Sequence, residues 1–196
     1  MNSRFALAFA MCLTWGEAFS QQVQVQTNQG SITIELYGDK APATVANFLQ
    51  YVFLQYVKDD FYSGTVFHRV INGFMIQAGG LTRDMQEKRT RAPVKNEADI
   101  GIKAGLRNTT GTLAMARTSN PDSASAQFFI NLKDNDFLNH SSATPSGWGY
   151  AVFGKVTKGM EIVQKIAAVE TATAGPYQNV PRTAIVIESM TVVPVK

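Results

Sequence analysis

The segment FHRVINGFMIQAGG, at residues 67–80, restricts the fold of this chain more than any other stretch. Its central pair, Asn72-Gly73, favours the tight two-residue turns that join antiparallel strands, because both residues tolerate positive φ. Apolar runs at 66–71 and 74–78 lie on either side of this pair. The segment therefore predicts a buried β-hairpin, and with it an antiparallel sheet.

Other short segments have the same character. Apolar and polar residues alternate at 23–27 and 32–36, around the turn Asn28-Gln29-Gly30, which predicts another hairpin. Helical spacing is confined to a segment from Pro42 toward Lys58 and to a shorter one after Gly159. Many short strands with two helices and no βαβ alternation indicate an antiparallel barrel or sandwich. Further strands are expected at 112–116, 128–132, 150–156 and 184–193.

Length and composition predict one globular domain. The 196 residues are enough for a sizeable core, and the 45% hydrophobic and 17% charged content is that of an ordered protein. The net charge of +3 comes from scattered lysines and arginines rather than from a basic block. A nucleic-acid partner is therefore not expected.

Residues 1–20 have the pattern of a secretory signal. Arg4 precedes an apolar run at 5–15, and the small residues Ala18 and Ser20 suit cleavage before Gln21. The run is shorter than the roughly 20 apolar residues of a membrane-spanning helix. The sequence thus predicts a signal at 1–20 and a domain at 21–196 with no membrane association, although an uncleaved anchor is the alternative.

A tandem repeat lies in the first predicted helix, where LQYVF at 49–53 is followed by LQYVK at 54–58. Five added residues rotate the rest of a helix by about 140°, so the two copies cannot share one buried face. The repeat predicts an extra turn or a bulge at the surface.

Few residues could carry familiar chemistry. The two histidines, His68 and His140, are far apart, and no metal-ligand spacing, nucleophile elbow or phosphate-binding loop is present. We therefore expect no metal and no cofactor. A histidine in an apolar strand, such as His68, is usually a packed core residue. Strand periodicity alone would make Arg69 an edge charge paired with a surface carboxylate.

Several longer motifs resemble one family. The segment FYSGTVFHRVINGFMIQ at 61–77 is similar to the signature of the cyclophilin peptidyl-prolyl isomerases. GTLAMART at 111–118, SAQFFIN at 125–131 and FGKVTKGMEIV at 153–163 resemble further motifs of that family, in the same order. The resemblance extends from Val23 to Val193. It implies a closed eight-stranded antiparallel β-barrel capped by two α-helices, an all-β fold.

The resemblance also implies functional residues. Arg69 would be catalytic, donating a hydrogen bond to the prolyl nitrogen while the X-Pro bond is twisted, and Gln77 would bind substrate and orient Arg69. The implied proline pocket is apolar, the residue before proline lies along the strand edge at Ala116, and Gln127 lines the adjoining groove. The full set of implied substrate-binding residues is Phe74, Met75, Ala116, Arg117, Gln127, Phe129, Phe137, Leu138 and Tyr150.

Three positions depart from the pattern of many eukaryotic members. Phe137 stands where those members have tryptophan, and loss of that tryptophan accompanies weak cyclosporin binding in the family. Tyr150 replaces a histidine, and Arg117 replaces an asparagine. The segment 139–149 is longer than in those members and resembles the bacterial branch. For a bacterial protein, the glycosylation patterns that begin at Asn108 and Asn139 carry no meaning.

We therefore expect a monomeric, periplasmic isomerase that acts on proline-containing unfolded or partly folded polypeptides exported with it. The alternative is a chaperone or binding module that holds proline-containing segments with little turnover. The combination of Arg69, Gln77 and Phe129 favours the enzyme, since a pure binder could lose the arginine.

Overall fold

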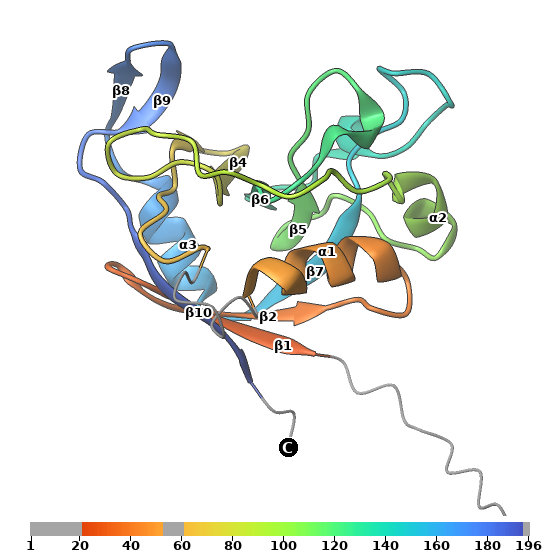
Figure 1. Cartoon of the computed structure of the whole chain (residues 1–196), viewed down its shortest axis with the longest axis horizontal. Coiled ribbons are helices and arrows are strands. Elements are labelled where there is room, and N and C mark those ends of the chain that lie inside the picture. The colour runs from red at the N-terminus through yellow and green to blue at the C-terminus, as the bar shows by residue number, and fades with distance from the viewer. Residues whose placement is uncertain (1–20, 53–60, 194–196) are drawn as a thin grey trace, which may run out of the picture.

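A computed structural model describes residues 21–52 and 61–193. Its main element is an eight-stranded antiparallel sheet in the order β10-β1-β2-β7-β5-β6-β4-β3, which curls on itself (Figure 1). The predicted all-β class is therefore confirmed. The strands are β1 (Gln22–Thr27), β2 (Gly30–Leu36), β3 (Arg69–Ile71), β4 (Met75–Ala78), β5 (Thr112–Met115), β6 (Phe128–Asn131), β7 (Val152–Lys158) and β10 (Ile187–Val193).

The barrel is not fully closed, which corrects the expectation of a closed one. The outer strands β3 and β10 do not form a ladder with each other. A seam joins them instead, with a single bridge between Val66 and Val186 and a hydrogen bond of 2.9 Å from the Phe67 amide to the Ile185 carbonyl. The predicted strand at 66–71 is regular only over Arg69–Ile71, and Val66 forms an isolated bridge with Val186 instead of extending it.

Residues 21–52 and 61–193 contain three α-helices, whereas two were expected. Helices α1 (Pro42–Val52) and α3 (Met160–Ala167) begin where the sequence predicts, whereas α2 (Ala98–Lys103) was not foreseen. A separate two-stranded sheet, β8 (Thr171–Ala174) with β9 (Tyr177–Pro181), was also not predicted and projects from one end of the molecule (Figure 1). The signal segment and the second copy of the repeat lie outside the described residues.

A buried carboxylate holds the start of α1. The side chain of Glu97 accepts hydrogen bonds from the amides of Ala43 and Thr44, at 3.1 and 2.8 Å. These amides belong to the first turn of the helix, where no partner exists within the helix itself. The contact therefore ties α1 to the distant segment that leads into α2.

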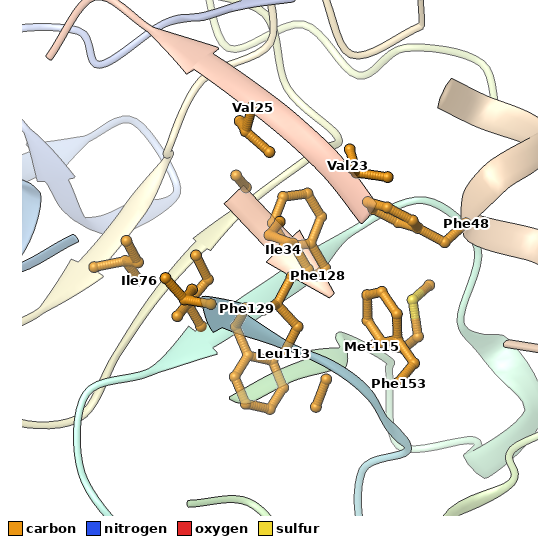
Figure 2. Close-up of a cluster of buried hydrophobic side chains, with 14 of the residues drawn as sticks. Val23, Val25, Ile34, Phe48, Ile76, Leu113, Met115, Phe128, Phe129 and Phe153 are labelled. Atoms are coloured by element: carbon orange, nitrogen blue, oxygen red, sulfur yellow. The ribbon is translucent and has the colours of Figure 1, made fainter. Parts of the chain in front are cut away.

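Aromatic and branched side chains fill the interior of the curled sheet. Phe48 of α1 lies against Phe128 of β6 and Phe153 of β7, with ring centroids 5.7 and 5.0 Å apart (Figure 2). Val23 and Ile34 close the same cluster from β1 and β2. This core fixes the strands, and the alternate residues of β4 and β6 then face the opposite side of the sheet.

Candidate active site

Strand register brings the predicted catalytic residues into one row. Arg69 on β3 is paired with Gln77 on β4, and Gln77 is paired with Phe129 on β6. Side chains at directly paired positions lie on the same face, with Cβ atoms about 5 Å apart. The hairpin around Asn72-Gly73 therefore places an arginine, a glutamine and an aromatic ring side by side.

An apolar pocket of about 110 Å³ opens beside this row, and we call it the apolar pocket. It contains every predicted site residue except Gln127 and Phe137. Three of its lining residues, Met75, Phe129 and Leu138, are buried. The residues that line it are Arg69, Phe74, Met75, Gln77, Ala116, Arg117, Phe129, Leu138 and Tyr150.

Aromatic rings form the walls and the rim of the apolar pocket. The edge of one ring meets the face of the other between Phe129 and Tyr150, whose centroids are 5.6 Å apart. At the rim, Phe137 stacks on Phe74 at 5.7 Å and keeps 72% of its surface exposed. Phe137 therefore lies at the entrance and contacts the pocket through Phe74.

Arg69 carries a positive charge with no counter-ion among the described residues. Its Nη1 donates to Oε1 of Gln77 at 3.4 Å, a long and weak hydrogen bond, and Nε2 of Gln77 donates to Oε1 of Gln127 at 2.9 Å. The ion-paired edge charge that periodicity alone favoured is thus not found in this part of the chain. The guanidinium keeps donors that a ligand in the apolar pocket could use.

Residues 22–192 match the model of the family described as cyclophilin type peptidyl-prolyl cis-trans isomerase/CLD. The chain belongs to this family. It is 54% identical over 170 residues to peptidyl-prolyl cis-trans isomerase B of Escherichia coli, covering 87% of this chain and 98% of that protein. It is 53% identical over 191 residues to a peptidyl-prolyl cis-trans isomerase of Acinetobacter baylyi, covering 97% and 95% of the two chains. It is therefore a peptidyl-prolyl cis-trans isomerase.

A solved cyclophilin structure has the same fold. The cyclophilin type peptidyl-prolyl cis-trans isomerase of Cryptosporidium parvum superposes with a TM-score of 0.70 at 25% identity, covering 91% of this chain and 100% of the other. The predicted family resemblance is confirmed by these comparisons.

In this cyclophilin the second arginine of the apolar pocket is bound to main-chain carbonyls. Arg117 donates from Nε to Gly149 and from Nη1 to Thr118, both at 2.9 Å, and from Nη2 to Pro145 at 3.2 Å. Its guanidinium also lies 4.7 Å from the centre of the Tyr150 ring. Arg117 therefore braces the segment before Tyr150, unlike Arg69, whose donors are mostly unused.

A second cavity, of about 340 Å³, adjoins the apolar pocket at Arg69 and Gln77, which line both spaces. We call it the polar hollow, because His68, Glu87 and Gln127 contribute to its lining. Residues 176–179 of the unforeseen β8–β9 ribbon complete it. Sequence reasoning placed Gln127 in an adjoining groove but missed the ribbon, whose small and polar residues give no strong strand signal.

His68 is buried beside the polar hollow, as predicted for a core histidine. Only 5% of its surface is exposed, and burial lowers its pKa to about 4, an effect that the neighbouring Arg69 charge strengthens and contacts with Val66 and Gln127 partly offset. Its Nδ1 accepts or donates no hydrogen bond within the described residues. The imidazole is thus neutral near pH 7 and holds no proton to donate as an imidazolium.

The remaining features concern ligands and membranes. No group of three or more His, Cys, Asp or Glu residues within 21–52 and 61–193 could hold a metal ion. None of the helices in this part of the chain is long and apolar enough to cross a bilayer.

Proposed function

We propose that Arg69 accelerates rotation about the X-Pro bond by donating a hydrogen bond to the prolyl nitrogen. Amide resonance gives this bond partial double-bond character and a rotational barrier of about 20 kcal/mol. At the twisted transition state the resonance is lost, and the nitrogen lone pair becomes a hydrogen-bond acceptor. A donor that meets the nitrogen only in the twisted state lowers the barrier without tightening the binding of either planar isomer.

The observation that carries this proposal is a guanidinium that has no counter-ion among the described residues and lies at the edge of the partly open apolar pocket. Arg69 lines the pocket and has no carboxylate partner among the described residues, so its charge is not neutralised by the protein. Arginine stays protonated at any physiological pH and presents a rigid set of donors. In a site partly screened from water such a donor stabilises developing acceptor character more strongly than water would.

The apolar pocket is proposed to hold the proline ring while the preceding residue rotates. Phe129, Met75 and Leu138 are buried side chains that offer apolar contact to a five-membered ring and no hydrogen bond to compete with Arg69. This contact is nearly the same for the cis, trans and twisted forms, so it contributes to substrate affinity rather than to turnover. Phe74 and Phe137 extend the apolar surface toward the entrance.

Gln77 is proposed to orient Arg69 and to bind the substrate main chain. Its Oε1 accepts a hydrogen bond from Arg69, and its Nε2 donates one to Oε1 of Gln127. The bond to Gln127 fixes the orientation of the Gln77 amide. A fixed Gln77 restricts the arginine to the orientations that keep the contact. Each 1.4 kcal/mol of transition-state stabilisation gained in this way is about tenfold in rate.

We further propose that the enzyme acts on exported polypeptides in the periplasm, as a monomer. The support for export is the pattern of residues 1–20, with Arg4, the apolar run at 5–15 and the small residues Ala18 and Ser20. N-terminal sequencing of the secreted protein is expected to begin at Gln21. Recovery of the full-length chain from the cytoplasm would contradict export and leave the catalytic proposal intact.

The catalytic proposal is tested with a protease-coupled assay on an X-Pro tetrapeptide. Arg69→Ala should lose most of kcat while peptide affinity, measured by titration, changes little. Arg182→Ala removes an exposed arginine paired with Glu170 and serves as the matched control. Equal kcat for the wild type and Arg69→Ala would overturn the mechanism, and binding without turnover by the wild type would favour the holding function instead.

A further inference from the structure

We propose that three buried asparagines position the walls of the apolar pocket. Asn108, Asn131 and Asn135, which we call the asparagine ladder, are each at most 1% exposed. None of them lines the pocket. This inference rests on the proposed function, which assigns proline binding to the apolar pocket. The three asparagines would position the pocket walls and would not contact the substrate.

The three amides are joined in one direction. Nδ2 of Asn135 donates to Oδ1 of Asn131 at 2.8 Å, and Nδ2 of Asn131 donates to Oδ1 of Asn108 at 3.2 Å. Asn131 also donates to Oγ1 of Thr112 at 3.0 Å. Hydrogen bonds arranged head to tail in a buried site polarise and strengthen one another.

Both ends of the asparagine ladder donate to main-chain carbonyls of pocket residues. At one end, Nδ2 of Asn135 donates to the carbonyl of Phe74 at 3.1 Å. At the other, the two hydrogens of Asn108 Nδ2 are shared among the carbonyls of Leu138 and Tyr150, at 3.2 and 3.3 Å, and Oδ1 of Asn139 at 3.1 Å. Phe74, Leu138 and Tyr150 all line the pocket and come from separate segments of the chain.

The register explains why the asparagine ladder lies next to the pocket. Asn131 follows Phe129 by two residues on β6, so the two side chains share a face of the sheet. Asn131 is also paired directly with Met75, as Phe129 is with Gln77. The asparagine ladder thus occupies the row adjacent to the catalytic row.

The orientation of Asn135 indicates that it is retained for its two donors. Its Nδ2 faces two acceptors, the Phe74 carbonyl and Oδ1 of Asn131, so a flipped amide would set oxygen against oxygen. Its own Oδ1 accepts no hydrogen bond within the described residues. A buried acceptor without a partner lowers stability, and an apolar residue would avoid that loss. The donors to Phe74 and Asn131 are the benefit that offsets it.

The asparagine ladder also gives a structural reason for Asn108. The sequence pattern Asn108-Thr109-Thr110 fits a glycosylation acceptor, but the Asn108 amide is buried and all its described contacts are internal. The side chain joins the segments before Leu138 and Tyr150 instead.

The test uses Asn135→Asp, which keeps the shape of the side chain and removes its amide donors. When the aspartate is ionised, it repels the Phe74 carbonyl, and the pocket wall should shift. We expect KM for an X-Pro peptide to rise about 5- to 20-fold at pH 8 with kcat within about twofold, because positional loss affects ground-state and transition-state binding alike. Burial favours the protonated carboxyl, which can donate one bond, so KM should recover toward the wild-type value at pH 5.5.

Asn47→Asp provides the matched control. Asn47 is a buried amide on α1 that donates to the Ser125 carbonyl at 2.6 Å, and it does not contact the pocket. The same exchange there should lower the melting temperature and leave KM and its pH dependence unchanged. A wild-type KM for Asn135→Asp at pH 8, or an equal rise in both variants, would overturn the proposal.

A second variant decides the case if Asn135→Asp does not fold at pH 8. Asn131→Ser interrupts the asparagine ladder at its middle without adding a charge, and KM should rise at least about threefold. An unchanged KM in that variant would also refute positioning. Wild-type turnover and its loss in Arg69→Ala are measured in parallel, so that failure of the catalytic proposal is seen separately from failure of the asparagine ladder.

Discussion

The apolar pocket and the polar hollow share two lining residues, Arg69 and Gln77, and they are built differently. The apolar pocket is lined by Met75, Gln77 and Phe129 of the inner strands β4 and β6. Other walls come from residues outside the strands, such as Phe74, Leu138 and Tyr150, whose main chain is bound to the asparagine ladder. The polar hollow is completed by the β8–β9 ribbon, which pairs only with itself. The contrast suggests that the enzyme fixes the geometry around the proline ring and leaves the surroundings of neighbouring residues adaptable.

The largest effect is expected from substitution of Arg69, one of the two residues that line both cavities. Arg69→Ala should reduce kcat by about 10²- to 10³-fold, the usual cost of removing one preorganised transition-state donor. Arg69→Lys should recover only part of this loss, because an ammonium group lacks the planar set of donors. Kinetics in the protease-coupled assay, with thermal unfolding to verify the fold, give the measurement. A kcat for Arg69→Ala within threefold of the wild type would contradict the assignment.

The next effect tests the apolar pocket by itself. Phe129→Ala should lower kcat/KM by about 100-fold, mainly through KM, and lower the free energy of unfolding by about 3 to 5 kcal/mol, because a buried ring is lost from the pocket floor. Phe129→Leu keeps most of the apolar volume and should recover most of both quantities. Steady-state kinetics and urea denaturation report them separately. A normal KM in Phe129→Ala would show that proline binds elsewhere.

A third effect concerns the buried histidine beside the polar hollow. Because the pKa of His68 is about 4 in the folded protein and about 6.5 when unfolded, the unfolded state binds the extra proton as the pH falls through this window. Stability should therefore decrease by roughly 2 to 3 kcal/mol between pH 7 and pH 4.5. His68→Gln should remove this part of the pH dependence, as measured by urea denaturation at each pH. The same slope in both proteins would contradict the low pKa.

The smallest effect is expected from a substitution in the polar hollow, the cavity that we infer to be adaptable. Tyr177→Ala removes a ring of the β8–β9 ribbon from the polar hollow and should change kcat/KM by less than about threefold for a short X-Pro peptide. A longer peptide that reaches the hollow should reveal a larger difference. A tenfold loss with the short peptide would show that the hollow is as strictly built as the apolar pocket.

Much of the fold is predictable from short-range patterns. The Asn72-Gly73 pair predicted the β3–β4 hairpin, but not its two-residue turn: the loop has three residues, 72–74, and only Gly73 has a positive φ, of 69°. This loop length sets the register that places Arg69 against Gln77. The β8–β9 ribbon was missed because Thr171–Ala174 alternates small residues that are all partly or largely exposed, so no apolar period marks it. Helix α2 was missed because it is only six residues long and contains Gly101.

The candidate site was predictable only through the family resemblance, and the roles of its residues stay predictions. Periodicity suggested an ion pair for Arg69, since sequence spacing does not show which carboxylates lie nearby in space. The asparagine ladder could not be foreseen at all. Asn108 and Asn135 are isolated polar residues in different segments, and only the folded sheet brings them to either side of Asn131.

The seam between β3 and β10 affects how the enzyme should lose activity on heating. Arg69 begins the outermost strand of the sheet, a strand of three residues that forms no ladder with β10. The segment before this strand is joined to the segment before β10 by a single bridge, between Val66 and Val186. Such borders separate before the interior melts. Thermal inactivation should accordingly begin several degrees below the calorimetric midpoint, and a crosslink across the seam would bring the two temperatures together.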